Sequence, residues 1–583
     1  MQVETSSAPA KATGGGTQPA RGSGDVAWRE LFTPKLIIAL REGYDATKFR
    51  HDVVAGLTVA ILALPLSMAI AIGSGVDPGV GLITSVVAGF FISALGGSRF
   101  QIGGPAAAFI VIVAGIVHKH GFDGLQTATF IAGFILLAAG LLKLGSFARY
   151  VPGPVILGFT SGIGAVIAIG QLKDFLGLSG DVPGEVIEKV HAIWNLRHTF
   201  SPSAFAIGLA TLVLIETFRR FQPRMPGLLI SIVVVSAIAW AMHLPVDTVG
   251  TRFGGIPQSL PAPHLPSLGW AKVVEVLPTS LTLAFLIGVE SLLSAVAADA
   301  MTGARHRSNM EVIAQGVANV ASPMFGGLPA TGVIARTGTN IQAGAWTPIS
   351  GIMHAVFVLL AMLLLAPLAA YLALPALAAV LISVAWRLLD LSEVSHFLRR
   401  APLDDRLVLL ATLLLTVFVD LNVAIGVGVT MAALLFMHRM AEAHHVGLGL
   451  ERVDSDDVAA IGPNTMHADE DIGRVTFRGP LFFGATAHIS RALHDVGKWP
   501  RALILNMADV PLIDASGIAA LEDLAETGRK QGCSVIVESL RPEPLAALRR
   551  YGILDSDNLI IAADSVEALA RARRIVAEAG ARA

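Results

Sequence analysis

The sequence predicts a polytopic α-helical membrane protein with fourteen spans in two inverted seven-helix repeats, followed by a small cytoplasmic α/β domain. Of the 583 residues, 54% are hydrophobic and 15% are charged, whereas soluble domains average about 45–50% and about 25%. Apolar runs follow one another from Asp52 to Met440, and the longer ones approach the roughly 20 residues that a helix needs to cross a bilayer. From Ile472 onward, buried strand runs alternate with amphipathic helices, which is typical of a soluble α/β domain.

The N-terminal residues are expected to lie outside any folded domain. Residues 1–25 are rich in Ala, Gly, Ser, Pro and Thr, a composition that cannot bury enough apolar surface to fold, so we expect a disordered tail. No charged segment followed by a short apolar segment lies near Met1, so a cleaved secretory product is not expected. Residues 26–51 are predicted to form a cytoplasmic segment before the first span.

The predicted membrane domain covers residues 52–440 and contains fourteen apolar runs. The positive-inside rule tests this count, because basic residues collect in cytoplasmic loops. With a cytoplasmic N-terminus, the loops predicted to lie inside are the basic ones, and the even count returns the C-terminus to the cytoplasm. The runs are 52–73, 78–95, 105–117, 125–145, 153–171, 203–218, 226–243, 278–299, 310–325, 329–342, 347–367, 375–389, 406–421 and 423–438. The inside loops contain Arg99; Lys143 and Arg149; Arg219, Arg220 and Arg224; Arg305 and Arg307; and Arg387, Arg399, Arg400 and Arg406.

Two of these runs are too short to cross a bilayer and are predicted to be half-helices. The third begins after the Gly-Gly-Pro segment 103–105 and ends before His118, and the tenth begins after the Gly-Gly-Leu-Pro segment 326–329. If the second half of the domain starts near Pro278, both breaks lie at nearly the same distance from the start of their halves. Interrupted segments at matching positions indicate a midplane binding site between two repeats. Seven spans in each half require the repeats to have opposite orientations.

The starts of the two half-helices form the candidate binding site. A helix N-terminus carries about half a positive charge and several unpaired N–H groups, so two facing N-termini favour a small anion. The structural alternatives are close helix packing for the glycines and a plain N-cap for Thr331. The candidates are Gly104, Pro105, Ala106 and Ala107 in the first half, and Thr331, Gly332, Val333, Ile334, Ala335 and Arg336 in the second.

Glu290 is the candidate coupling residue. It lies inside the apolar run 278–299, where an ionisable side chain is costly unless it is paired or used. Ser294 follows by four residues and shares the helix face. A proton on Glu290 would remove its repulsion of a bound anion, and a sodium ion would act in the same way with Ser294 as an oxygen ligand. The alternative is a static ion pair with Arg336, and Asp299 is expected to be a solvated helix end.

Charge and cysteine content exclude several other classes of protein. The net charge is −2, so no basic field exists to hold nucleic acid. The single cysteine, Cys533, excludes an intramolecular disulfide and a cysteine-based zinc cluster, and we expect it to be a buried small hydrophobe. The sequence has no Walker A, His-Glu-x-x-His, kinase or cyclase pattern, which argues against an enzyme, and no cofactor is expected.

Several segments resemble the SulP (sulfate permease) anion transporters, and the resemblance covers nearly the whole chain. They are Asp52 to Ala71 with Leu64-Pro65-Leu66, Gly97 to Ala107, Glu290-Ser291-Leu292-Leu293, and Ala330 to Thr337. Segments 71–76 and 158–164 are similar to bacterial members related to the dicarboxylate and succinate carriers.

The SulP resemblance implies a core and a gate, an elevator-like movement and a location in a bacterial inner membrane. It also implies an anion site with contacts from Leu66 and Ile70 on the first helix, Ala106 on the third, and Val333, Ile334, Ala335 and Arg336 on the tenth. Family members often have a threonine where Ala106 stands, so this chain lacks one hydroxyl donor.

The C-terminal domain is predicted over residues 472–583, after a linker at 441–471. The Asp-Ala-Ser-Gly segment 514–517 resembles the signature of STAS domains, which end SulP chains and are similar to anti-sigma-factor antagonists. In those antagonists the serine before the glycine is phosphorylated, which makes Ser516 a candidate, and the alternative is an N-cap serine. A homodimer and a cytoplasmic protein partner of this domain are further expectations. The predicted strands include 475–477, 502–505 and 534–537, and the predicted helices are 517–530, 543–551 and 565–579.

Together these observations predict a secondary active transporter of small anions, coupled to protons or sodium. Sulfate, bicarbonate and C4-dicarboxylates all suit a small oxyanion site, and the sequence leaves the choice open. The alternatives are an uncoupled exchanger or channel on the same scaffold, and a membrane-embedded enzyme or receptor whose output is the soluble domain.

Overall fold

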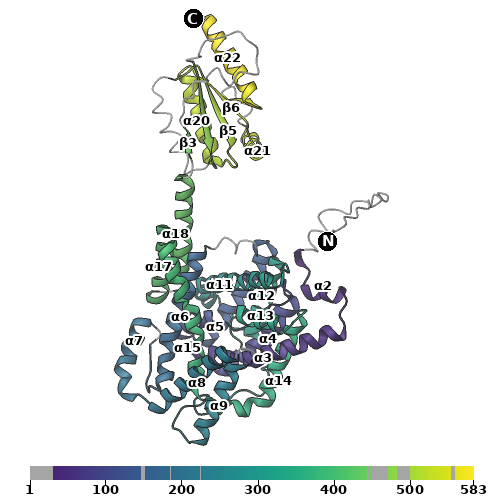
Figure 1. The fold of residues 1–583 in the computed structure, drawn as a ribbon, viewed down its shortest axis with the longest axis vertical. Coiled ribbons are helices and arrows are strands. Elements are labelled where there is room, and N and C mark those ends of the chain that lie inside the picture. The colour runs from purple at the N-terminus through teal and green to yellow at the C-terminus, as the bar shows by residue number, and fades with distance from the viewer. Residues whose placement is uncertain are drawn as a thin grey trace, which may run out of the picture. The chain divides into compact units, whose positions relative to one another are not determined.

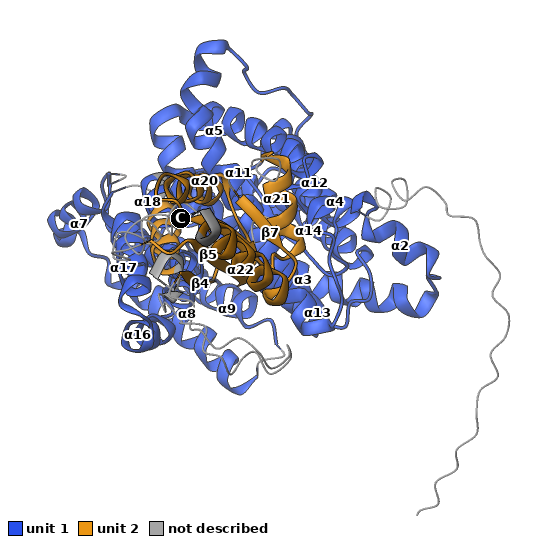
Figure 2. Cartoon of the chain, turned by 90° about the horizontal axis from the view of Figure 1, so that it is seen from above, with its two compact units in different colours: residues 1–429 blue, residues 430–583 orange. Residues whose placement is uncertain are grey.

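The chain divides into two compact units, residues 1–429 and residues 430–583 (Figure 2). The computed structural model describes residues 31–145, 152–183, 185–222, 225–419, 421–442, 445–447, 471–481, 499–552 and 559–582. The predicted disordered tail, 1–25, lies outside the described residues, as does most of the predicted linker at 441–471.

The first unit is built from helices (Figure 1). Seven helical segments of the described chain are long and apolar enough to cross a membrane. A further pair, Val186–Thr199 and Pro202–Phe221, passes the same test jointly but is bent by 117°. The seven segments are α3 (Ala46–Gly73), α4 (Pro78–Leu95), η1 (Ala107–Phe109) with α5 (Ile110–Leu141), α6 (Gly153–Leu176), α11 (Trp270–Thr302), α14 (Ile349–Ala369), and α15 (Leu374–Leu389) with α16 (Leu391–Arg400).

Helical structure lies at each of the fourteen predicted apolar runs. The third and fourth runs share α5, which is broken at Gly121, where φ is 71° and ψ is 179°. The other runs coincide with helices that do not qualify singly as membrane-crossing by length and composition, so the number of spans remains a prediction. These are α8 (Pro202–Phe221), α9 (Gly227–Ala241), α12 (Ser308–Met324), α13 (Ile334–Gln342), α17 (Leu403–Phe418) and α18 (Leu421–Glu442).

Several short helices lie outside the predicted runs. Most have a strongly one-sided or polar sequence, so an apolar run of membrane length could not reveal them. They are α2 (Lys35–Arg41), α7 (Val186–Asn195) with η3 (Leu196–Thr199), α10 (Val249–Phe253) and α16.

The same order of elements occurs in both halves of the first unit. In the first half, α3 and α4 are followed by the strand β1 (Gly103–Gly104) and the half-helix that starts at Ala107. In the second half, α11 and α12 are followed by the strand β2 (Thr331–Gly332) and the half-helix α13. The two strands pair antiparallel, Gly103 with Gly332 and Gly104 with Thr331. Equivalent segments therefore run in opposite directions at this point, as inverted repeats require.

Two buried carboxylates hold loops of this unit to helices. Asp52, on α3, accepts hydrogen bonds from the backbone N–H groups of Trp346 at 2.8 Å and Thr347 at 3.1 Å, just before α14. Glu311, on α12, accepts hydrogen bonds from the N–H groups of Gly97 at 2.9 Å and Ser98 at 3.1 Å, just after α4. Both carboxylates are fully buried, and the backbone donors compensate for the lost hydration.

The second unit contains a five-stranded sheet with the order β3-β4-β5-β6-β7. β3 pairs antiparallel with β4, and the other neighbours pair parallel. β3 lies inside the segment predicted as a linker, so that segment contributes a strand to the domain. The elements are β3 (His445–Gly447), β4 (Ile472–Arg478), β5 (Ala502–Asp509), β6 (Ser534–Glu538) and β7 (Leu559–Ala562), with α20 (Ala515–Lys530), α21 (Pro542–Arg550) and α22 (Ser565–Arg582).

Helices cover both faces of this sheet, because neighbouring strand residues point to opposite sides. Leu503 and Leu505 belong to a core that includes Leu521 of α20. Ile504, between them, belongs to a second core that includes Ala568 of α22. The expectation of an α/β domain is confirmed.

Cys533 is buried, as predicted, with 3% of its surface exposed. Burial raises the pKa of its thiol to about 12, so the thiolate that would react is scarce at neutral pH. The residue therefore acts as a small core side chain.

Candidate functional site

The antiparallel pair of β1 and β2 brings the two predicted half-helices together. Two residues separate the end of β1 from the start of η1, and one residue separates the end of β2 from the start of α13. Two glycines permit this crossing at close range. A Cβ atom on Gly104 would overlap the guanidinium of Arg336, and a Cβ atom on Gly332 would overlap the side chain of Gln101.

Neither half-helix has a capping side chain at its N-terminus. The N-cap residues are Ala106 for η1 and Val333 for α13, and neither makes a side-chain cap hydrogen bond. An uncapped helix start leaves backbone N–H groups available to a ligand, and the helix dipole favours a negatively charged ligand. Thr331 is not an N-cap, because it lies in β2, and its hydroxyl donates to the carbonyl of Ile287 at 3.1 Å.

Arg336 lies on α13 and is fully buried. One terminal nitrogen donates to Ser85 Oγ at 3.2 Å and to the carbonyl of Gly103 at 3.3 Å. The other donates to Ser67 Oγ at 3.0 Å and to the carbonyl of Pro105 at 3.4 Å. Its Nε atom has no hydrogen-bond partner. The guanidinium therefore holds the segment that leads into the first half-helix and places a positive charge beside it.

The other predicted contact residues lie around this crossing with different exposure. Leu66, Ile70 and Ala106 are buried, with 7%, 2% and 1% of their surfaces exposed. Gly104 and Pro105 are also buried, whereas Ala107 and Val333 are half-buried. Ile334 and Ala335, at the start of α13, are exposed.

Glu290 lies on α11, and its Oε2 atom is buried without a hydrogen-bond partner. No ion pair joins it to Arg336, whose terminal nitrogens bind serines and carbonyls, so the alternative of a static ion pair is wrong. Asp299, near the end of the same helix, is not simply solvated, because its carboxylate accepts a hydrogen bond from the N–H of His306 at 2.9 Å.

Ser294 connects α11 to the crossing. Its hydroxyl donates to Thr337 Oγ1 at 3.2 Å, and the same Thr337 oxygen accepts the N–H of Ile102 at 3.2 Å. Three segments therefore meet at one threonine, and Ser294 lies one helical turn from Glu290.

Sequence reasoning missed four polar residues that build this region. Ser67, Ser85 and Thr337 make the contacts described above, and Gln101 donates to the carbonyl of Ser291 at 3.1 Å. Each lies in or beside an apolar run, which is the signal that could have identified them, because a buried polar side chain in such a run needs a partner.

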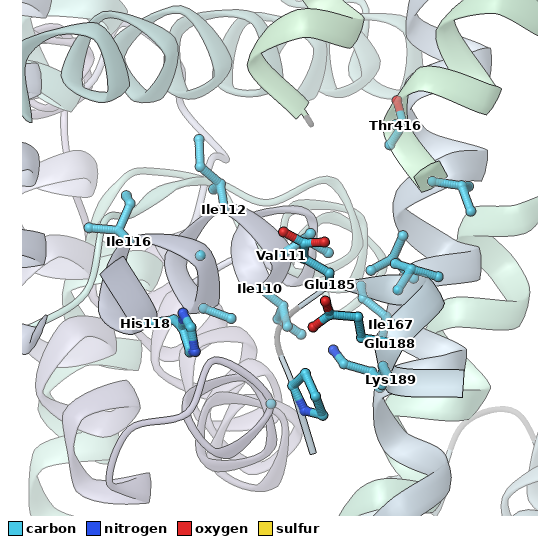
Figure 3. Close-up of a pocket in the computed structure, with 18 of the residues that line it drawn as sticks. Ile110, Val111, Ile112, Ile116, His118, Ile167, Glu185, Glu188, Lys189 and Thr416 are labelled. Atoms are coloured by element: carbon cyan, nitrogen blue, oxygen red, sulfur yellow. The ribbon is translucent and has the colours of Figure 1, made fainter. Parts of the chain in front are cut away.

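A cavity of about 510 Å³ lies next to this region, and none of the ten predicted substrate-contact residues lines it (Figure 3). One wall is the stretch of α5 from Ile110 to Ile116, and another is the end of α6 with Ile167. Glu188 and Lys189 of α7 reach toward Ile110 from the opposite side (Figure 3).

In the second unit, the alternative role of Ser516 as the N-cap of α20 is wrong. Asp514 is the N-cap, and its carboxylate accepts a hydrogen bond from the N–H of Gly517 at 2.8 Å. Ser516 is the second residue of the helix and is half-buried.

Comparison with known proteins decides the family. The sequence model of the Sulfate permease family matches residues 49–412. The chain belongs to the sulfate permease family. The STAS domain model matches residues 465–568, so the second unit contains a STAS domain.

Similar proteins cover most of the chain. A putative sulfate transporter of Bacillus subtilis, YvdB, is 38% identical over 516 residues, which is 88% of this chain and 95% of that protein. The bicarbonate transporter BicA of Synechocystis is 33% identical over 501 residues, which is 83% of this chain and 87% of that protein. These relatives are transporters, so this member of the sulfate permease family is a membrane transporter of anions and not an enzyme.

Solved structures agree with this assignment. The transmembrane domain of a cyanobacterial BicA is 33% identical, with a TM-score of 0.60, and covers 66% of this chain and 99% of that one. SLC26A9 has a TM-score of 0.83 over 97% of this chain and 98% of that one, and its 18% identity shows the fold alone. The expected fold class, a helical membrane domain followed by a STAS domain, is confirmed.

Proposed function

We propose that this protein is a secondary active transporter that binds a small oxyanion at the starts of the two half-helices, η1–α5 and α13. The pairing of β1 with β2 carries the proposal, because it brings two uncapped helix N-termini to one place. The proposed contacts are Leu66, Ile70, Gly104, Pro105, Ala106, Ala107, Val333, Ile334, Ala335 and Arg336.

The electrostatics of this place favour an anion. Each helix start contributes about half a positive charge, and the buried guanidinium of Arg336 adds a full one, bound to neutral serines and carbonyls. In this arrangement Arg336 holds the segment that orients the N–H groups of the first half-helix, and its positive charge attracts the anion to them. Because its terminal nitrogens already have partners, Arg336 acts on the anion through its charge, and backbone N–H groups make the hydrogen bonds.

The substrate class follows from the positive charge and the backbone donors of the site. Sulfate, bicarbonate and C4-dicarboxylates present small oxyanions, and relatives named as sulfate and bicarbonate transporters support the first two. Ala106 supplies no hydroxyl, so discrimination rests on backbone donors and on the shape made by Leu66 and Ile70.

Glu290 is the proposed coupling residue. Its buried, unpartnered oxygen is an acceptor that a proton or a sodium ion would satisfy, with Ser294 as a further oxygen in the sodium case. Neutralising this carboxylate removes its repulsion of the anion, so cation and anion binding favour each other. An elevator movement of the core would then carry both across a bacterial inner membrane, with both termini in the cytoplasm.

The STAS domain is proposed to mediate contacts outside the membrane domain, in a homodimer or with a cytoplasmic protein. Ser516 is the proposed phosphorylation site. A phosphate there would lie at the N-terminus of α20, where the helix dipole stabilises negative charge. Mass spectrometry of the protein purified from growing cells tests this proposal, and a STAS domain unmodified at Ser516 under all growth conditions would remove it.

Uptake by the purified full-length protein in proteoliposomes tests the main proposal. Labelled sulfate, bicarbonate and succinate are offered in parallel, with protein-free liposomes as the control. We expect saturable accumulation of at least one anion above its external concentration when a proton or sodium gradient is imposed. Saturable uptake that never exceeds equilibrium would indicate an exchanger or channel, and no uptake of any of the three would reject the proposed substrate class.

A further inference from the structure

Lys189 is a charged residue in the wall of the cavity in Figure 3. It lies on the amphipathic helix α7 and lines the cavity opposite Ile110 and Val111 of the half-helix (Figure 3). Its side chain is half-buried. A Cβ atom on Gly170 would lie 3.9 Å from its Nζ atom, so the ammonium group lies against α6.

The ammonium group of Lys189 has no ion-pair partner in the described part of the chain, because no carboxylate there lies within 4.0 Å. A long cationic side chain that is half-buried usually pairs with a carboxylate or reaches water with its charged end. Here Glu185 and Glu188 line the same cavity but are exposed, so solvent screens them more strongly than Lys189. The unpaired charge is available to a soluble anion.

The α5 part of the cavity contributes histidines and a lysine, not carboxylates. His118, Lys119 and His120 line it. His120 Nδ1 lies 2.9 Å from Glu275 Oε1, so His120 is already engaged, whereas Lys119 is exposed at the rim. Lys189 is therefore the half-buried lysine that α7 contributes to the wall of the cavity.

The cavity lies along the same faces of α3 and of the first half-helix as the proposed anion site. Gly73 lines it and follows Ile70 by three residues and Leu66 by seven on α3, so all three share one helix face. Ile110 also lines it and lies one turn beyond Ala107 at the start of the half-helix. An anion in the cavity is thus close to the proposed site.

We propose that Lys189 captures the oxyanion in this cavity before it reaches the half-helix starts. This inference rests on the proposed function and adds a second anion-binding position to the same pathway. The capture position raises the local concentration of substrate, so it acts on the apparent affinity more than on the turnover rate.

Initial uptake rates of the full-length protein in proteoliposomes test the proposal. At low ionic strength, Lys189→Gln should raise KM about threefold to tenfold and leave kcat nearly unchanged, because one unscreened charge is lost. Lys189→Arg should keep the wild-type KM. Glu188→Gln, the matched control on the neighbouring residue, should lower KM, because it removes a competing negative charge. Added salt should shrink the difference between wild type and Lys189→Gln.

Two results would overturn the capture role. One is a KM for Lys189→Gln equal to that of the wild type at low ionic strength, with the variant monodisperse on size-exclusion chromatography. The other is an equal rise for Lys189→Arg and Lys189→Gln, which would show that shape and not charge matters. If Lys189→Gln does not fold, two other measurements decide. A lower KM in Glu188→Gln and a wild-type KM that rises with salt support the capture role, and the absence of both overturns it. Absence of all anion uptake by the wild type would instead reject the proposed function.

Discussion

At the scale of single residues, Arg336 both holds the backbone of the site in place and supplies a positive charge to it. Its terminal nitrogens donate to two serines, one on α3 and one on α4, and to two carbonyls, one in β1 and one just after it. The sequence suggested direct complementation of an oxyanion, whereas the structure shows a guanidinium that supports the backbone which would bind the anion. Removing the side chain should therefore affect both folding and affinity.

Arg336→Ala should raise the KM for uptake about tenfold or more and also lower the melting temperature. It would leave the buried carbonyls of Gly103 and Pro105 without a donor, which costs about 1–3 kcal/mol for each unsatisfied group. Ser85→Ala is the matched control and should have a smaller effect on both, because it removes one acceptor of the guanidinium and the hydrogen bond between Ser85 and Ser67 but keeps the buried charge. Uptake kinetics and thermal unfolding in detergent measure the two effects, and an unchanged KM in folded Arg336→Ala would remove the residue from the site.

Glu290→Gln should abolish the dependence of uptake on the coupling ion. In the wild type, acidic external pH should speed uptake if the ion is a proton, because protonation removes a negative charge near the anion. The glutamine variant imitates the neutral acid, so its exchange of anions should not vary with pH or sodium. Glu275→Gln, on the exposed start of the same helix, should retain the full response. A Glu290→Gln protein that also retains the full response would contradict the coupling role.

At the scale of elements, the crossing of β1 and β2 organises the site. Each strand has only two residues, so their pairing is stable only because helices surround it. Thr331 anchors β2 to α11, and Thr337 joins α13 to α11 and to the residue before β1. A change that separates the strands should therefore reduce transport while the helices persist.

Gly104→Ala tests this directly. The added Cβ atom would overlap the Arg336 guanidinium, so the strand or the arginine must move, and we expect a loss of transport of about tenfold or more. Gly338→Ala is the matched control on α13, because nothing lies within 4 Å of its Cβ position and alanine favours a helix interior by about 0.5–1 kcal/mol. Transport assays at equal expression compare the two. Normal activity of Gly104→Ala would show that the close approach is not needed.

At the scale of the whole molecule, the two units have separate hydrophobic cores. The sheet of the second unit includes β3, which lies inside the segment predicted as a linker and pairs with β4. The predicted linker at 441–471 suggests a cut near its middle, at Val458. Such a cut would keep β3 and remove its partner strand, so it is a poor boundary between the units. A cut after Glu442, at the end of α18, leaves no unpaired strand.

A chain ending after Glu442 should insert into the membrane and remain monodisperse. Its core does not depend on the STAS domain, whereas its transport should fall if that domain stabilises a dimer. Size-exclusion chromatography and uptake assays check the two expectations, with the chain cut near Val458 as the comparison. Aggregation of the chain ending after Glu442 would show that the membrane unit does not fold independently.

The sequence by itself determined the class of protein, the order of its apolar helices and the position of the two half-helices. These features are local, because hydrophobicity, Gly-Pro breaks and the period of strands and helices can be read within about twenty residues. It also indicated Glu290 and the half-helix starts, because a charge and a broken helix are conspicuous in an apolar run.

Only the tertiary structure decided how these parts meet. Arg336 binds Ser67, which is 269 residues away, and Asp52 binds the backbone at Trp346, 294 residues away. No local pattern encodes such pairs, since any buried polar residue in an apolar run could satisfy another. The cavity beside α7 and the strand β3 were missed for the same reason: short, polar elements acquire their role from the helices and strands against which they pack.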